Sequence, residues 1–170
     1  MSSPFPQPAP DFSDPLGLLR ACHGRIEQHS QLLLQLAQQL QQQGCSAELS
    51  QAADKVYRYF STAVRHHHED EERDLFPRLT QLAAEQLNTL RQQHQQLDAQ
   101  WAAVATLLRH PATIEDRAEF VRLGEALASA YREHIALEEA EILPLAEQIL
   151  DRDQLKALGQ AMATRRGVPL

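Results

Sequence analysis

Two segments of the chain repeat one spacing of histidine, glutamate and proline. They read HHHEDEERDLFP over residues 66–77 and EHIALEEAEILP over residues 133–144. In each segment a histidine is followed by glutamates at i+4 and i+5 and by proline at i+10. The i, i+4 pairs are His67 with Glu71 and His134 with Glu138. Because residues i and i+4 lie on one face of a helix, each pair directs an imidazole and a carboxylate the same way, which is typical of metal ligation.

Four long helical patterns must position these segments. Apolar periodicity, capping residues and prolines place them over residues 14–44, 46–77, 83–109 and 113–150. Asp14 is the expected N-cap of the first, and Pro77 is expected to end or kink the second. Thr113 is expected to begin the fourth, with Asp116 as its capping-box partner. Glycine is scarce and strand-like alternation is absent. The sequence therefore predicts an all-α fold, an up-down antiparallel four-helix bundle with a short C-terminal helix.

Each helical pattern places one histidine on its apolar face. The third has the seam Leu87, Leu90, His94, Leu97, Trp101, Val104 and Leu108, with spacings of three and four. His23, His67 and His134 fall on the stripes of the other three patterns. A single buried histidine is usually a hydrogen-bonded core residue. Glu71 and Glu138 change this interpretation, because buried carboxylates are costly unless they are paired or bound to metal. A solvated face is expected for the other acidic residues of the first segment, Glu69, Asp70, Glu72 and Asp74.

Length and charge narrow the class of protein. The 170 residues suggest one domain, with a flexible proline-rich arm (residues 1–13), the bundle (14–150) and a short C-terminal helix and tail (151–170). A net charge of −7 and a pI near 5.6 argue against nucleic-acid binding. Neither a secretory signal nor a membrane-spanning run is found, so we expect a cytoplasmic protein without membrane contact.

Four sequence segments, CHGRIE, HHHEDEERDLFP, LRQQH and EHIALEEAEILP, resemble the hemerythrin-like, HHE cation-binding family. The resemblance extends from about residue 14 to about residue 150. It implies an up-down four-helix bundle with a non-haem di-iron centre between the helices. The ligands implied by the resemblance are His23, His67, Glu71, His94, His134 and Glu138. Glu71 and Glu138 would each bridge the two irons.

Counting coordination positions indicates a seventh ligand. Two octahedral ions offer about twelve positions, of which two bridging carboxylates and one oxo or hydroxo bridge would fill about six. Four histidines would leave about two positions open, and five about one. Family members that carry oxygen have their fifth histidine four residues after the third-helix histidine, where this chain has Asp98. Some relatives take a ligand directly after the second-helix histidine, which is His68 here. We interpret His68 as the seventh ligand, with Asp98 and His29 as alternatives.

The resemblance implies two iron ions, and the ligand types alone also tolerate manganese. Neither a helical HExxH motif nor the ferritin-type Glu-x-x-His order occurs in the chain, which disfavours a zinc protease and a ferritin-like site. The resulting prediction is a di-iron protein that binds O2, NO or a related small ligand in sensing, storage or stress response. One alternative is a redox enzyme acting on NO or peroxide, or in iron-cluster repair. Another is a structural helical bundle that takes up metal adventitiously.

Overall fold

The computed structural model describes residues 10–169, which fold into helices and connecting turns. No strand occurs within this range, so the predicted all-α class is confirmed. None of the helices in it is long and apolar enough to cross a lipid bilayer. Most of the proline-rich arm, residues 1–9, lies outside the described residues, and its flexibility stays a prediction.

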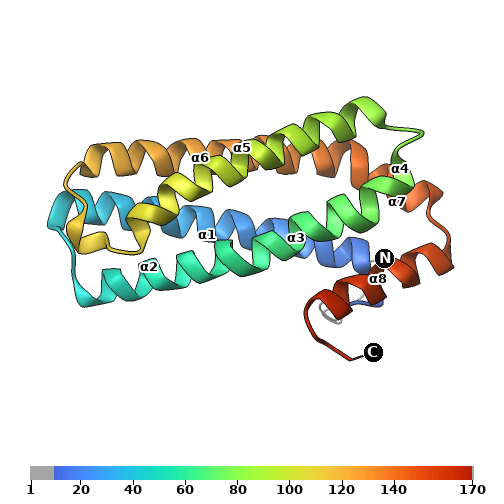
Figure 1. The fold of residues 1–170 in the computed structure, drawn as a ribbon, viewed down its shortest axis with the longest axis horizontal. Helices are drawn as coiled ribbons and strands as arrows, with labels where there is room; N and C mark the ends of the chain where they lie inside the picture. Colours follow the sequence, from blue (N-terminus) through green and yellow to red (C-terminus); the bar gives the residue numbers. More distant parts are fainter. Residues whose placement is uncertain (1–9, 170) are drawn as a thin grey trace, which may run out of the picture.

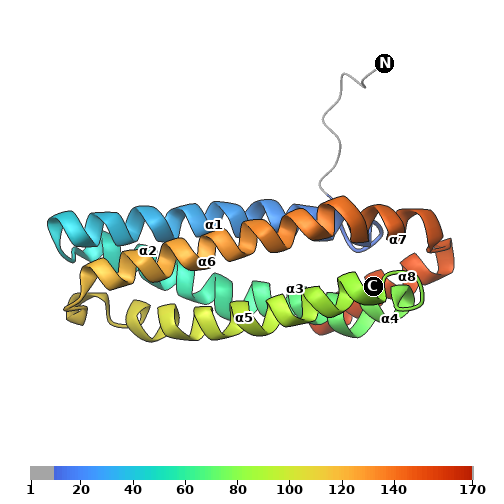
Figure 2. The same cartoon turned by 90° about the horizontal axis from the view of Figure 1, so that it is seen from above.

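Four long helical rods lie side by side along the molecule (Figures 1 and 2). The first is α1 (Pro15–Gln43) and the third is α5 (Ala84–Leu108). The second consists of α2 (Ala47–Tyr59), η1 (Phe60–Val64), α3 (Arg65–Asp70), η2 (Glu71–Leu75) and α4 (Phe76–Leu79). The fourth consists of α6 (Arg117–Leu137), η4 (Glu138–Ile142) and α7 (Leu143–Ile149). The colours in Figure 1 show that the chain reverses direction between successive rods.

Capping side chains fix where the rods begin. Asp14 accepts a hydrogen bond from the backbone N–H of Gly17 at 3.0 Å, and Ser46 accepts one from that of Leu49 at 3.1 Å. The first two rods therefore begin where the sequence predicts, because each cap satisfies an amide that would otherwise lack a partner.

The fourth rod begins later than predicted. Thr113 ends the short 3₁₀ helix η3 (Pro111–Thr113), and Asp116 caps α6 by accepting from the backbone N–H of Glu119 at 2.9 Å. The expected pairing of Thr113 with Asp116 is wrong, because Asp116 is itself the cap.

Pro77 does not end the second rod. It lies in the first turn of α4, where a missing N–H costs little, and the rod continues to Leu79.

The buried apolar side chains form two clusters at different levels along the four rods. One includes Ile26, Val64, Leu97 and Ile135, and the other includes Leu19, Leu75, Leu90 and Ile142. On every rod the boundary between the two clusters coincides with the predicted site histidine or with a glutamate beside it. Each rod thus contributes polar side chains to one layer that is covered by apolar side chains above and below.

The C-terminal helix α8 (Arg152–Arg165) packs against α1 and α3 near the end where α1 begins (Figure 1). Arg165 and Arg166 both donate to Asp70, and Arg165 also donates to Asp74 at 2.6 Å. The predicted solvated face is wrong for Asp70, whose side chain is fully buried. Gly159 allows a close approach, because a Cβ there would lie 1.9 Å from the carbonyl oxygen of Phe12.

Candidate metal centre

The polar layer contains six buried side chains that can ligate a metal. Each of them is at most 3% exposed: His23, His67, Glu71, His94, His134 and Glu138. They fall into two overlapping sets within which the ligand atoms lie no more than 4.8 Å apart. The first group is His23, His67, Glu71 and Glu138, and the second group is Glu71, His94, His134 and Glu138. Both glutamates belong to both groups.

The repeated motif adopts the same backbone form in its two copies. Glu71 opens the π-helical segment η2, and Glu138 opens the π-helical segment η4. In each case the backbone N–H five residues further on donates to the carbonyl of the glutamate. Single π turns within α-helices occur frequently at functional sites. Here they hold the two glutamates in equivalent local settings on opposite halves of the chain.

Glu71 directs its two oxygens toward different groups. Its Oε1 lies 3.1 Å from Nε2 of His67 and 3.9 Å from Nε2 of His23, both in the first group. Its Oε2 lies 3.3 Å from Nε2 of His94, in the second group. One carboxylate oxygen is therefore available on each side.

Glu138 has the same arrangement. Its Oε2 lies 3.1 Å from Nε2 of His23 in the first group, and its Oε1 lies 3.5 Å from Nε2 of His134 in the second. The Nε2 atoms of His94 and His134 are 3.1 Å apart. Two carboxylates that each face both groups have the donor arrangement of a pair of bridging ligands.

Hydrogen bonds on the outer side of the layer fix three of the imidazoles. The Nδ1 atom of His23 donates to Glu139 at 2.6 Å, and that of His94 donates to Glu72 at 2.7 Å. His134 donates from Nδ1 to the side-chain oxygen of Gln93 at 3.0 Å. Because these oxygens can only accept, Nδ1 carries the proton and Nε2 of the neutral ring is left with its lone pair. The three rings therefore present their Nε2 atoms to the layer.

Glu72 and Glu139 are functional residues that the sequence reasoning missed. Both are the second glutamate of the repeated motif, and each orients a histidine of another rod. Glu72 was expected on a solvated face, but its half-exposed side chain accepts from His94. Arg20 donates to Glu139 at 3.3 Å and holds it toward His23. The recurrence of a glutamate at i+5 in both motif copies was the available signal.

Several buried polar atoms of the layer have no hydrogen-bond partner within the part of the chain that the structure describes. They are both ring nitrogens of His67, Nε2 of His68, Oε2 of Glu71 and Oε1 of Glu138. Buried polar groups are usually satisfied, and leaving several unsatisfied in one place is costly. Imidazole nitrogens and carboxylate oxygens converging on one volume are the donors that iron and manganese accept. The residues present therefore fit a metal site.

The protonation of the layer reflects its buried charges. Burial acts to lower the pKa of His23 and of His94, but nearby carboxylates outweigh it. Glu138 and Glu71 raise the pKa of His23 to about 11, and Glu71, Glu138 and Glu72 raise that of His94 to about 9. Burial, together with the charge of Glu71, raises the pKa of Glu138 to about 8. The pKa of Glu71 is held well below its usual range, because the surrounding imidazoles outweigh its burial. Without metal, protons on imidazoles thus compensate the carboxylate charge.

The three candidates for a seventh ligand lie in different places. His68 is buried, and it forms a third possible metal-binding set with His94 and His134. The side chain of Asp98 is 78% exposed, with Oδ1 3.9 Å from Nδ1 of His68. His29 stacks on Tyr59 with ring centroids 3.6 Å apart, away from both groups. Of the three, His68 is the one that joins the buried cluster.

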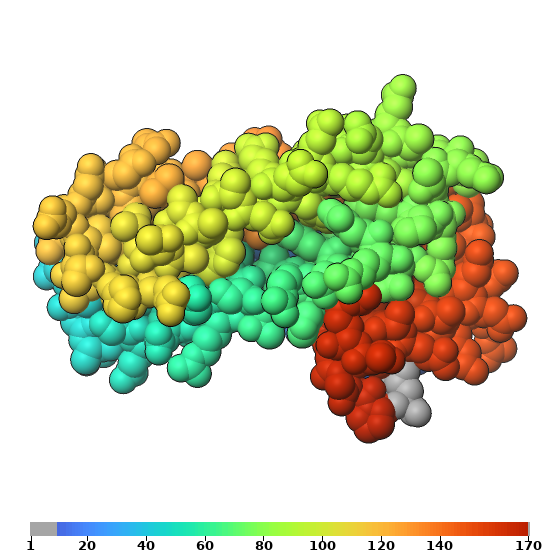
Figure 3. All heavy atoms as spheres, in the orientation of Figure 1, coloured from blue at the N-terminus to red at the C-terminus, as the bar shows by residue number. Residues whose placement is uncertain are grey.

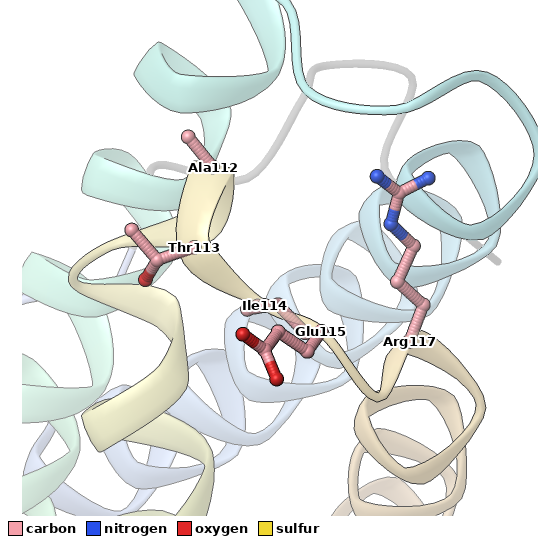
Figure 4. A pocket seen from close by; sticks show the side chains of 5 residues that line it. All are labelled: Ala112, Thr113, Ile114, Glu115 and Arg117. Carbon is pink, nitrogen blue, oxygen red and sulfur yellow. The ribbon is translucent and has the colours of Figure 1, made fainter.

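A hollow opens beside the second group of donors. The second rod, at α3 and η2, forms one side of it, and α5 forms the other. Its volume is about 240 Å³, and we call it the α3–α5 hollow. It is lined by Arg65, His68, Glu69, Glu72, Arg73, His94 and Asp98. Figure 3 shows the surface hollowed along the line where α5 meets the second rod. A separate hollow lies between η3 and the start of α6 and contains none of the site residues (Figure 4). It is lined by Ala112, Thr113, Ile114, Glu115 and Arg117.

Replacing Glu139 by alanine is expected to weaken metal binding by about 10- to 100-fold, because His23 would lose the acceptor that fixes its proton on Nδ1. A competition titration against a chelator of known affinity measures this change. Glu147→Ala is the matched control. Glu147 also binds Arg20 and lies on the same rod, but its hydrogen bond is to Arg20 and not to a site histidine. Equal metal affinity in the two variants would show that Glu139 does not support the site.

The all-helical fold and its buried layer of imidazoles and carboxylates define a helical metal-binding protein. A family model described as the hemerythrin HHE cation binding domain matches residues 14–146. The chain therefore belongs to the hemerythrin HHE cation-binding family, as its motifs predict. A similar protein, described as uncharacterized, occurs in Haemophilus influenzae. It is 29% identical over 166 residues, which cover 96% of each chain.

Proposed function

We propose that this protein holds two iron ions between the rods of an up-down four-helix bundle and uses them to bind a small molecule such as O2 or NO. The first ion would take His23 and His67, and the second would take His94, His134 and His68. Glu71 and Glu138 would bridge the pair. The observation that carries the proposal is that each glutamate directs one oxygen toward each group of histidines.

The donor count differs between the two groups. With His68 the second group offers five protein donors, whereas the first group offers four. Two iron ions would supply an open coordination position and reversible one-electron chemistry. The lower donor count would leave that open position on the side of His23 and His67. Both of these side chains are at most 3% exposed, so the surrounding protein restricts the ligand to a molecule of a few atoms.

The residues of this chain have three tasks in such a centre. Glu72, Glu139 and Gln93 orient imidazoles of the layer through their Nδ1 atoms. The glutamates in the layer compensate the positive charge of the ions. The two apolar clusters exclude bulk water from both sides of the layer, which strengthens electrostatic interactions within it.

The proposal is tested first by the metal content of untagged protein purified without chelator or added metal. We expect about two irons per chain, since two groups of donors are present. Absorption spectra of the reduced protein exposed to O2, NO or azide then test ligand binding. Stable spectral changes support a binding protein, whereas catalytic consumption of peroxide or NO would replace that function with a redox enzyme. A scattered mixture of metals that is lost on dialysis would overturn the proposal in favour of a structural bundle.

A further inference from the structure

The α3–α5 hollow connects the protein surface with the buried layer. Two of its lining residues, His68 and His94, belong to the set of three histidines whose ligand atoms lie close together. A larger hollow of about 520 Å³ lies between α1 and α6, and none of the candidate ligands lines it. The α3–α5 hollow is the smaller of the two, but candidate metal ligands line it.

The mouth of the α3–α5 hollow is polar and carries a slight excess of negative charge. Three carboxylates, Glu69, Glu72 and Asp98, face two guanidinium groups. Arg73 lies 3.7 Å from Glu69, so these two charges largely compensate each other. Asp98 extends into solvent, with its side chain 78% exposed. Carboxylate oxygens of this kind are ligands that divalent cations accept together with water.

His68 stands between this mouth and the buried layer. Its Nδ1 lies 3.9 Å from Oδ1 of Asp98, and its buried Nε2 has no hydrogen-bond partner within residues 10–169. Its ring stacks on that of His94 with centroids 4.0 Å apart. Unlike the rings of His23, His94 and His134, it has no carboxylate or amide of the described residues within hydrogen-bonding distance. His68 thus lines the mouth of the hollow and also belongs to the buried histidine cluster.

We propose that the α3–α5 hollow is the route by which the metal ion is loaded into the centre. Asp98 and Glu72 attract the hydrated cation and supply its first oxygen ligands. His68 then transfers the cation to His94 and His134. The inference rests on the proposed metal centre and adds a kinetic role for the hollow that leads to it.

The test compares loading rates with final metal content. Metal-free protein is mixed anaerobically with Fe²⁺, and the iron that a fast colorimetric chelator no longer traps is followed over time. Asp98→Lys reverses the charge at the mouth, and Asp98→Asn removes it with little change in size. Glu27→Lys is the matched control, because it makes the same charge change at the hollow between α1 and α6. Asp98 and Glu27 are both exposed, so the folded structure tolerates these substitutions.

We expect Asp98→Lys to slow loading by about tenfold at low salt, with a smaller effect for Asp98→Asn and none for Glu27→Lys. High salt should reduce the difference, because it screens exposed charges. Final iron content should equal that of the unmodified protein. Equal loading rates in all variants, or equal slowing by Glu27→Lys, would overturn the proposed route. Loss of final iron content in Asp98→Asn would also overturn it, by assigning Asp98 to the resident ligands. Absence of stoichiometric iron in the unmodified protein would instead reject the metal centre itself.

Discussion

Replacing Glu138 by alanine is expected to reduce the metal content from about two ions per chain to well below one. Replacing His134 by alanine is expected to leave about one. The difference arises because Glu138 faces both groups of donors, whereas His134 belongs to the second group alone. Loss of His134 leaves the first group with all four of its donors. Elemental mass spectrometry of protein purified in parallel measures both values.

A second variant separates ligand loss from misfolding. Glu138→Gln keeps the size of the side chain, but its amide has a single acceptor oxygen and cannot bridge two ions. It should lose at least one of the two ions while the metal-free variant keeps the helix content of the unmodified chain by circular dichroism. Burial and the charge of Glu71 raise the pKa of Glu138 to about 8, so its carboxyl group is mostly neutral near pH 7 without metal. A neutral amide of the same size replaces it with little loss of stability of the metal-free fold. Two ions retained by both Glu138 variants would reject the bridging assignment.

Metal loading is expected to raise the melting temperature of the protein by about 8–16 °C. A ligand present at a thousand times its Kd stabilises the folded state by about 4 kcal/mol. For a chain of this size, each kcal/mol shifts the melting temperature by about 2–4 °C. The physical source is the buried layer, where ions would satisfy donors that have no hydrogen-bond partner among the described residues. Calorimetry of the metal-free and loaded protein measures the shift.

Glu138→Ala supplies the control for this measurement. Its melting temperature should not respond to added iron, because the ions would lose one of the two ligands that they share and the metal content falls well below one per chain. A similar shift in this variant would mean that iron stabilises the chain through surface sites. Full iron content without any shift in the unmodified protein would mean that the bound metal does not contribute to the folded state.

The residues that form the polar layer could be predicted from the sequence, because local periodicity shows which side chains of a helix face the interior. His94 interrupts an apolar seam with spacings of three and four, and such a seam faces the interior wherever the neighbouring rods lie. The same reasoning placed His23, His67 and His134 correctly on buried faces. The i+4 spacing placed Glu71 and Glu138 beside them. That these side chains ligate metal remains a prediction.

The supporting contacts could not be predicted in this way, because they join distant parts of the chain. Asp70 is buried by Arg165 and Arg166, which lie about a hundred positions later on a different helix. Glu139 reaches His23 across 116 positions. Acidic residues on a highly charged segment are usually solvated, and periodicity alone does not reveal a tertiary partner.

The π segments η2 and η4 set the rotational phase of the second and fourth rods. Around each of them the buried positions recur every four residues, at His67, Glu71, Leu75 and Leu79 and at His134, Glu138, Ile142 and Ala146. On an uninterrupted α-helix, steps of four drift by about 40° each, so three steps would turn the last side chain about 120° away from the interior. The wider turn absorbs this drift. Deleting one residue within either segment would therefore restore a regular α-helix, in which about eleven residues make three turns, and the side chains beyond it would stay in phase with the other rods. The change would be confined to the backbone around the glutamate that opens the segment.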